Sequence, residues 1–433
     1  MEGAGFEVLR PDYGPVKISL EEHIPAGADI VLLNTCSVRE FAEDKVYSHI
    51  GLFGRAKRTN PKLVVGLMGC MVEEHKEKLF RRFPQLDLMV GTRNIKELPA
   101  LVEDVLTHRR QVAKIKQDGI SIEYTDQIKR RGTGHAWLPV MTGCNKVCTF
   151  CIVPITRGSE VSMPAREVYR EASRLVADGV RWITLLGQNV NSYNGAPENQ
   201  DTSRISFPEL LEMLCQIEGL ERISFTTSHP HDATEELFQV IRRNPKISRH
   251  FHLPLQSGSD RVLKRMKRLH TFAEYKEKID RMRALIPGVS VTTDIIAGFC
   301  GETDEDHADT ERALQTLRFD GAFIYKYSVR PGTPAAKLTD DVPLPVKKTR
   351  NAALLAIQDA ITDENNARFL GATRTVFVDA LSTKDKAQLV GCAEDERKVV
   401  FPGEKDLIGK FLPVEFCELR HDTYIGRLAS VPV

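Results

Sequence analysis

Three closely spaced cysteines are the residues of this 433-residue chain best suited to redox chemistry. Cys144, Cys148 and Cys151 stand at the spacing C-x3-C-x2-C, just after an apolar run at 137–141. A [4Fe–4S] cluster normally takes four thiolates, so three leave one iron open for a substrate or cofactor. Zinc is the alternative, but zinc sites usually bring two C-x2-C pairs or His partners, and no such pair lies near. The spacing therefore favours an iron–sulfur site with an open iron.

A second pair of cysteines follows two apolar runs nearer the start of the chain. Continuous apolar runs lie within 29–34 and 63–68, as is typical of buried parallel strands, and they lead to Cys36 and Cys70. Open α/β sheets bind ligands at the carboxyl ends of their strands. The pair is therefore a candidate for a second cluster. The alternative is two buried core cysteines.

The clustered cysteines need a scaffold, and the middle of the chain predicts a β/α barrel. Short apolar runs alternate there with amphipathic segments at helical spacing, which implies parallel strands joined by right-handed crossovers. In β/α barrels the chemistry lies at the carboxyl ends of the strands, and the three cysteines directly follow the first strand. The predicted strands are 137–141, 182–186, 222–226, 250–255, 290–296 and 322–327, and the predicted helices are 166–178, 207–217, 233–243, 271–285 and 305–317.

Polar turns accompany the other predicted strands. They include Gly187 and Gln188 after the second strand, Ser228 after the third, Gln256 after the fourth and Asp294 in the fifth. A single turn of this kind is equally well explained by capping residues. Five turns at corresponding positions favour a ring of hydrogen-bonding groups around a bound nucleoside, which a glycine lets the backbone approach closely.

Several motifs resemble those of the radical S-adenosylmethionine (SAM) methylthiotransferases, and the resemblance covers essentially the whole chain. They are the cysteine run and the segments 34–45, 66–71, 186–193, 226–230 and 252–258. The resemblance implies an α/β fold in three parts: a flavodoxin-like α/β domain at 1–112, a partial (β/α)6 radical SAM barrel at 130–365 and a small all-β TRAM-like barrel at 366–433. Short alternating runs separated by turns after residue 371 independently favour the small β barrel.

The resemblance also implies two [4Fe–4S] clusters and their ligands. One cluster, on Cys144, Cys148 and Cys151, binds SAM and cleaves it reductively, and Phe150 places its backbone against the SAM adenine. An auxiliary cluster is held by Cys36, Cys70 and a third cysteine. Contacts to ribose, methionine or substrate are expected from Gly187, Gln188, Ser228, Gln256 and Asp294.

The implied reaction adds a methylthio group to C2 of N6-isopentenyladenosine at position 37 of tRNA, with one SAM as methyl donor and one as radical source. The motifs at 34–45 and 186–193 separate this branch from those acting on threonylcarbamoyl-adenosine in tRNA or on a ribosomal-protein aspartate. Those targets remain alternatives, as does a non-catalytic iron–sulfur protein that binds RNA. The expected partners are the anticodon loop of isopentenylated tRNA and an electron donor such as flavodoxin or ferredoxin.

The sequence departs from the family pattern at its start. The family's first auxiliary ligand lies in a Gly-Cys-Gln-Met-Asn type motif after the first strand, whereas this chain opens on 1–8, which reads like the end of the family's first helix. As written, the first strand and one cluster ligand are absent. We therefore expect this form to lack a complete auxiliary cluster and to be inactive in methylthiolation. About eight irons per chain with full turnover would contradict that expectation.

The remaining features predict an ordinary soluble protein. Hydrophobic residues make up 42% and charged residues 27%, and neither a signal peptide nor a membrane-spanning run is evident, so a cytoplasmic monomer is expected. Net charge is +1, so RNA contacts would need local patches such as the cations at 261–268 and 129–131. The other cysteines are predicted to be structural: Cys215, Cys300 (where the family usually has proline), Cys392 and Cys417.

Overall fold

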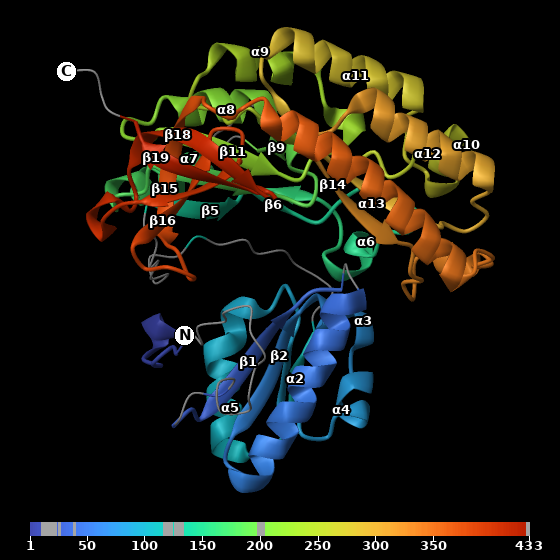
Figure 1. Cartoon of the computed structure of the whole chain (residues 1–433). Coiled ribbons are helices and arrows are strands. Elements are labelled where there is room, and N and C mark those ends of the chain that lie inside the picture. Colours follow the sequence, from blue (N-terminus) through green and yellow to red (C-terminus); the bar gives the residue numbers. More distant parts are fainter. Residues whose placement is uncertain are drawn as a thin grey trace.

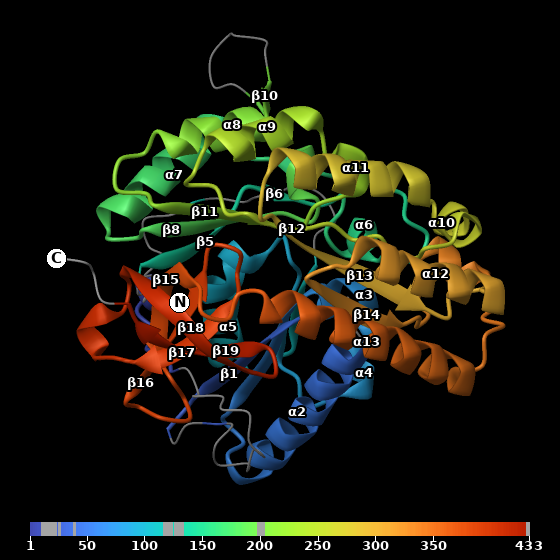
Figure 2. The same cartoon turned by 45° about the horizontal axis from the view of Figure 1, so that its top comes forward.

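The computed structural model describes residues 1–9, 24, 27–37, 40–115, 124, 134–196 and 204–429 (Figures 1 and 2). The expected RNA-contacting cations at 129–131 lie outside these residues. Within the described part of the chain, no helix combines the length and apolar composition that a membrane crossing requires.

The front part of the chain is a four-stranded parallel sheet with helices on its faces. The order β1-β2-β3-β4 follows the sequence. Side chains such as Phe53, Leu67 and Met89 are fully buried against one face, and Val102 is fully buried against the other. The elements are η1 (Glu2–Ala4), β1 (Ile30–Thr35), α2 (Glu40–Thr59), β2 (Val64–Gly69), α3 (Cys70–His75), α4 (Lys78–Arg82), β3 (Leu88–Val90), η2 (Ile95–Glu97), α5 (Leu98–His108) and β4 (Val112–Lys114).

Six parallel strands form the middle part, as two three-stranded sheets in the orders β11-β8-β5 and β12-β13-β14. The two sheets curve together, and helices cover their outer side (Figure 2). The elements are β5 (His135–Pro139), β6 (Met141–Thr142), α6 (Val153–Thr156), β7 (Val161–Ser162), α7 (Ala165–Ala177), β8 (Trp182–Leu186), η3 (Val190–Ser192), β9 (Asn194–Gly195), β10 (Ile205–Ser206), α8 (Phe207–Cys215), β11 (Arg222–Thr226), η4 (Pro230–Asp232), α9 (Glu235–Arg243), β12 (His250–His252), α10 (Asp260–Met266), α11 (Phe272–Leu285), β13 (Ser290–Ala297), α12 (Asp304–Leu317), β14 (Gly321–Lys326) and η5 (Pro334–Lys337).

A long helix leads from this sheet to a closed five-stranded barrel at the end of the chain. The strand order is β15-β16-β17-β19-β18, which leaves no free sheet edge. Phe401, Phe416 and Tyr424 fill its interior. The elements are α13 (Leu344–Ala367), β15 (Thr373–Leu381), β16 (Gln388–Ala393), β17 (Lys398–Pro402), η6 (Lys405–Leu407), β18 (Phe411–Arg420) and β19 (Thr423–Leu428).

The observed barrel strands agree with the predicted ones to within one residue at each end, except at two places. The first predicted strand, 137–141, is β5 followed by the short β6. The fourth, 250–255, ends at His252, because Pro254 has no N–H to donate and the backbone N of Leu255 donates to the hydroxyl of Thr293 instead of to a carbonyl (2.9 Å). A proline and a side-chain acceptor together interrupt this ladder.

Candidate active site

The loop that carries the three clustered cysteines follows β5 and β6, at the carboxyl end of the first barrel strand. Cys148 is buried, and Cys144 and Cys151 are half-buried. The backbone N of Cys144 donates to the carbonyl of Gly158 (3.1 Å), and that of Cys151 donates to the carbonyl of Cys148 (3.1 Å). The structure therefore places the predicted loop where β/α barrels place their chemistry.

Burial disfavours the ionised form of two cysteines of the loop. Burial raises the pKa of the Cys151 thiol to about 12, with further contributions from Cys148 and Cys144. Burial also raises the pKa of Cys144, and Cys148 adds to this effect. The three sulfurs thus lie within electrostatic reach of one another. A metal ion bound to Cys144 and Cys151 would offset the cost of ionising them, because a coordinating thiol is deprotonated outright.

An ion-pair network fixes the cysteine loop to the next two strands. Lys146, inside the loop, donates to Asp232 (2.8 Å), and both side chains are 16% exposed. Asn189, after β8, donates to the other oxygen of Asp232 (2.7 Å). Three hydrogen bonds, from Asn189, Lys146 and His231, lower the pKa of Asp232 although burial opposes them. The ionised carboxylate thereby ties the loop to the ends of β8 and β11.

A buried arginine contacts the second cysteine of the loop. Arg268 Nη1 lies 3.3 Å from Cys148 Sγ, and its Nη2 donates to the carbonyl of Pro254 (2.6 Å). His229 Nε2 is 4.0 Å from the same sulfur. Burial lowers the pKa of His229, with Arg268 as the next cause, so this imidazole is neutral. A guanidinium close to a thiol favours the thiolate, which is the ligand form.

One of the five cations at 261–268, Arg268, is buried beside Cys148. Arg261 pairs with Asp306, and Arg265 donates to the carbonyl of Cys300 (3.0 Å), although both side chains are exposed. Lys264 and Lys267 are exposed and have no hydrogen bond or ion pair in the described structure. The expected RNA contact stays a prediction for the four exposed cations. Sequence alone shows five cations but not which face each side chain takes.

Two of the residues expected to contact the cofactor also contact the cysteine loop or the residues beneath it. Gln188 Oε1 accepts from the backbone N of Gly143 (2.7 Å), so this side chain positions the cysteine loop. A Cβ on Gly187 would lie 2.6 Å from Met141 Cγ, so glycine is required there by packing beneath the loop. Phe150 is half-buried and packs against the apolar cluster that includes Phe299.

The other expected residues present unpartnered polar atoms, and these fit a polar cofactor. Ser228 Oγ and Gln256 Oε1 are buried and have no hydrogen-bond partner among the described residues. The same holds for two oxygens of neighbouring side chains, Asn189 Oδ1 and Thr227 Oγ1. Asp294 lies beside His252, with 3.3 Å between Oδ2 and Nε2. Buried polar atoms without partners are costly, so their clustering at strand ends indicates a site for hydrogen-bonding ligands such as SAM.

The two front-domain cysteines lie next to each other at the ends of β1 and β2. The register pairs Thr35 with Gly69, so Cys36 and Cys70 follow at neighbouring positions. Thr35 Oγ1 donates to the carbonyl of Met68 (2.7 Å) and holds the two strand ends together. Gly69 has φ 101°, and a Cβ there would lie 2.5 Å from the carbonyl O of Thr35. Cys70 is buried and Cys36 is exposed.

The front domain turns its cysteine end toward the cysteine loop of the barrel. Helix α3, which begins at Cys70, contacts α6, which begins two residues after Cys151 (Figure 1). Thr92 Oγ1, after β3, donates to the carbonyl of Thr156 (3.0 Å). Glu43 on α2 lies 3.6 Å from Arg330 of the barrel. The two candidate cluster sites therefore face each other across this interface.

The remaining cysteines take no part in this arrangement. Cys215 and Cys300 are buried among apolar side chains, as the sequence predicts. Cys392 and Cys417 lie in β16 and β18, but Cys417 is exposed and contributes nothing to the core.

Sequence reasoning missed Lys146, Asp232 and Arg268 as parts of the site. Lys146 stands between two predicted ligands, so its position in the sequence could have identified it as part of the site. Asp232 follows the polar turn after the third predicted strand, so it also had a signal. Arg268 had none beyond its membership of a basic run.

Comparison with known proteins identifies relatives of this arrangement. The Radical SAM superfamily matches residues 138–314, and the uncharacterized protein family UPF0004 matches residues 19–91. A tRNA-2-methylthio-N(6)-dimethylallyladenosine synthase of Carboxydothermus hydrogenoformans is 42% identical over 90% of this chain and 88% of its own length. The enzyme of the same name from Aeromonas salmonicida is 41% identical over 93% of this chain and 84% of its own.

Solved structures show the same fold at low sequence identity. A radical SAM methyltransferase, TsrM, from Kitasatospora setae aligns with a TM-score of 0.52 at 15% identity, over 73% of this chain and 67% of its own. At this identity the likeness concerns the fold alone.

Proposed function

The chain belongs to the family of tRNA-2-methylthio-N(6)-dimethylallyladenosine synthases, and from this premise we propose which of its residues carry the reaction. The protein is a radical SAM enzyme, and the reaction proposed for it converts N6-isopentenyladenosine in tRNA, at position 37, to its 2-methylthio derivative. The expectation that a form with an incomplete auxiliary cluster does not complete this reaction stays a prediction. Its cofactors are SAM and [4Fe–4S] clusters. The alternative targets, threonylcarbamoyl-adenosine and a ribosomal-protein aspartate, are not favoured by the names of these relatives.

Cys144, Cys148 and Cys151 are the proposed ligands of the SAM-binding cluster, because they lie together on one loop at the carboxyl ends of the barrel strands. When bound, such a cluster supplies the electron for reductive cleavage of SAM. The protein holds the loop rigid through Asp232 and offers the thiolate of Cys148 a guanidinium donor. The observation that carries this assignment is the clustering of these thiols beside unpartnered buried oxygens.

The polar atoms beside the loop are the proposed contacts to SAM and substrate. Ser228 and Gln256 offer buried hydrogen-bonding groups, and Asp294 lies on the neighbouring strand. Cys36 and Cys70 are the proposed auxiliary-cluster ligands that this chain contributes, and they face the cysteine loop. The electron donor is proposed to be a small flavodoxin- or ferredoxin-type protein, acting on a monomer.

The decisive test replaces one ligand and follows the first chemical step. In Cys148→Ala, reconstituted without oxygen and supplied with SAM and a strong reductant, we expect formation of 5′-deoxyadenosine to fall at least a hundredfold, because only two thiolates remain. Cys215→Ala is the matched control, since this cysteine is also buried but lies in the barrel core. Undiminished 5′-deoxyadenosine in Cys148→Ala would refute the assignment. Mass spectrometry of nucleosides from isopentenylated tRNA tests the product.

A further inference from the structure

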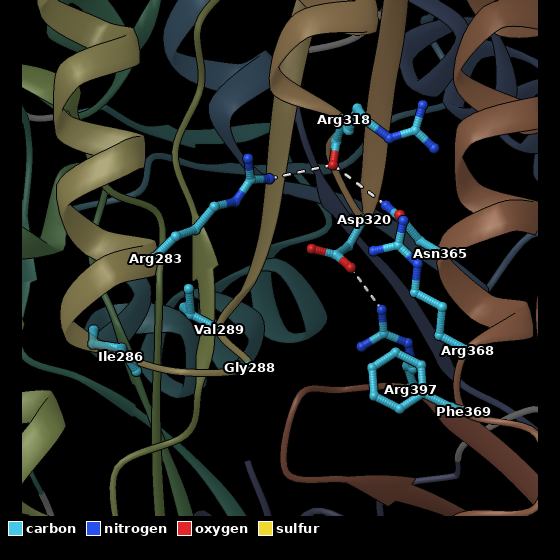
Figure 3. Close-up of a pocket in the computed structure, with 10 residues that line it drawn as sticks. All are labelled: Arg283, Ile286, Gly288, Val289, Arg318, Asp320, Asn365, Arg368, Phe369 and Arg397. Atoms are coloured by element: carbon cyan, nitrogen blue, oxygen red, sulfur yellow. Dashed lines mark hydrogen bonds and ion pairs between the residues drawn. The ribbon is translucent and has the colours of Figure 1, made fainter.

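A pocket lies at the opposite end of the barrel strands from the cysteine loop. Its volume is about 370 Å³, and it lies before the first residues of β13 and β14, where the end of α13 meets the small β barrel (Figure 3). Four arginines and a single aspartate line it: Arg283, Arg318, Arg368, Arg397 and Asp320. The cysteines lie at the carboxyl strand ends, so this pocket is a separate site.

The one carboxylate of the pocket is already fully engaged. Asp320 accepts from Arg397 (2.6 Å) through one oxygen and from the backbone N of Val291 (2.9 Å) through the other. Arg397 also pairs with Asp395 (2.5 Å). Arg397 thus neutralises Asp320 within the pocket wall. Both oxygens of Asp320 are engaged, so it offers no acceptor to the other arginines of the pocket.

The other arginines keep an excess of positive charge. Arg318 pairs with Glu364 at the rim. Arg283 Nη2 donates to the carbonyl O of Arg318 (3.2 Å), a neutral acceptor. Arg368 is exposed and has no hydrogen bond or ion pair with any residue in the described part of the chain. Figure 3 shows Arg283 entering from α11 and Arg368 from the side of α13.

We propose that this pocket binds a phosphate group through Arg283 and Arg368. A guanidinium presents several N–H donors in a rigid fork that matches the oxygens of phosphate, and two forks from different elements can hold one group from two sides. A Cβ on Gly288 in the wall would meet no atom within 4 Å, so that side leaves room for whatever carries the phosphate. The phosphate belongs either to an RNA backbone or to a small anion. The proposal does not rest on the reaction assigned above.

The test uses the full chain and two probes. The variant is Arg283→Gln with Arg368→Gln. The control is Arg243→Gln with Arg312→Gln, which removes two exposed arginines that pair with acidic residues elsewhere on the surface. In the first arm, inorganic phosphate replaces chloride at constant ionic strength and the melting temperature is followed. In the second arm, tRNA affinity is measured over a salt series.

We expect phosphate to raise the melting temperature of the wild type and the control but not of the variant. A tRNA affinity at least tenfold weaker in the variant, with a shallower salt dependence, identifies an RNA phosphate. Unchanged tRNA affinity together with a lost phosphate response identifies a small anion. The proposal is overturned if the variant and the control respond alike in both arms. Arg368→Gln alone removes no hydrogen bond or ion pair of the described structure, so it repeats the test with less disturbance than the double variant.

Discussion

At the scale of single residues, the surroundings of Cys148 distinguish it from the other two cysteines of the loop. It is buried, it lies 3.3 Å from the guanidinium of Arg268, and its other polar neighbour, His229, is neutral. A positive donor beside a ligating sulfur disperses the negative charge that a cluster gains on reduction. Arg268 is therefore a positioning residue whose effect should be seen in the cluster itself.

Arg268→Gln is expected to make the cluster potential more negative and to weaken iron retention by about tenfold, because residues that contact metal ligands commonly have effects of that size. The measurements are iron content and a redox titration after reconstitution. Lys264→Gln is the matched control, since this lysine is exposed and near in sequence. If both variants keep the wild-type potential and iron content, the role given to Arg268 is wrong.

At the scale of elements, the start of α12 holds the cysteine side of the barrel in place. Thr303 caps the helix, and Asp306 completes the capping box. Asp306 also accepts from Ser259 (2.6 Å), at the start of α10, and pairs with Arg261. Because α10 leads to Arg268, this carboxylate connects a helix cap to the cysteine loop. The capping box of Thr303 and Asp306 can be recognised in the sequence. The contacts that Asp306 makes with α10 cannot.

Asp306 should make stability depend on pH in acid. Burial opposes ionisation, but hydrogen bonds from Arg261, Ser259 and Thr303 hold the pKa of Asp306 well below its usual value. The stabilisation is therefore complete above about pH 4, the pKa of an unfolded aspartate, and is lost as the pH falls toward the folded value.

We expect Asp306→Asn to be less stable than the wild type at pH 7 and to show a smaller decline between pH 4 and 2, as measured by urea unfolding. Asp309→Asn, on the exposed side of the same helix, should follow the wild type. Parallel declines of the wild type and Asp306→Asn would contradict this account.

At the scale of the whole molecule, the two smaller domains contact opposite ends of the barrel strands. The front domain contacts the end that carries the cysteines. The small β barrel packs on the other end, where His135 stacks on Trp182 (4.0 Å between centroids) with the edge of Phe377 beside them. Buried Arg222 donates to the carbonyls of Cys392 and Ala393 (both 3.1 Å) across the same interface. The common direction of the parallel strands thus separates the reaction end from the packing end.

His135 should make this packing end sensitive to mild acid. Burial lowers the pKa of His135 to about 4, Glu396 opposes that shift and Arg222 adds to it. An unfolded histidine titrates near pH 6.5, so the unfolded chain binds more protons between about pH 6.5 and 4, and stability falls as the pH drops through this window. The expected loss is on the order of 2 kcal/mol.

His135→Phe keeps the stacking and should remove this part of the pH dependence, as followed by unfolding at pH 7 and pH 5. His108→Gln is the control, since this histidine is 60% exposed on α5. An unchanged slope in His135→Phe would show that other groups set the acid response.

The sequence alone predicted the candidate cysteine ligands, the order of strands and helices and the three-part architecture. Those features are local: ligand spacing, apolar periodicity and turn residues are read within a dozen positions. The strands at 182–186 and 222–226 were predicted to the residue because each is a continuous buried run between turns. The sequence did not predict interruptions that depend on a partner strand, such as the early end of β12.

Only the tertiary structure decided which polar residues meet. Lys146 and Asp232 are 86 positions apart, and Cys148 and Arg268 are 120 apart, so no local pattern links them. The same holds for Arg283 and Arg368, which line one pocket from two parts of the fold. Side-chain direction at a given position follows from packing against distant elements, and a charged residue reads alike in sequence whether it faces solvent, a carboxylate or a thiol. That is why the sequence does not show that one arginine of the basic run, Arg268, is buried beside Cys148.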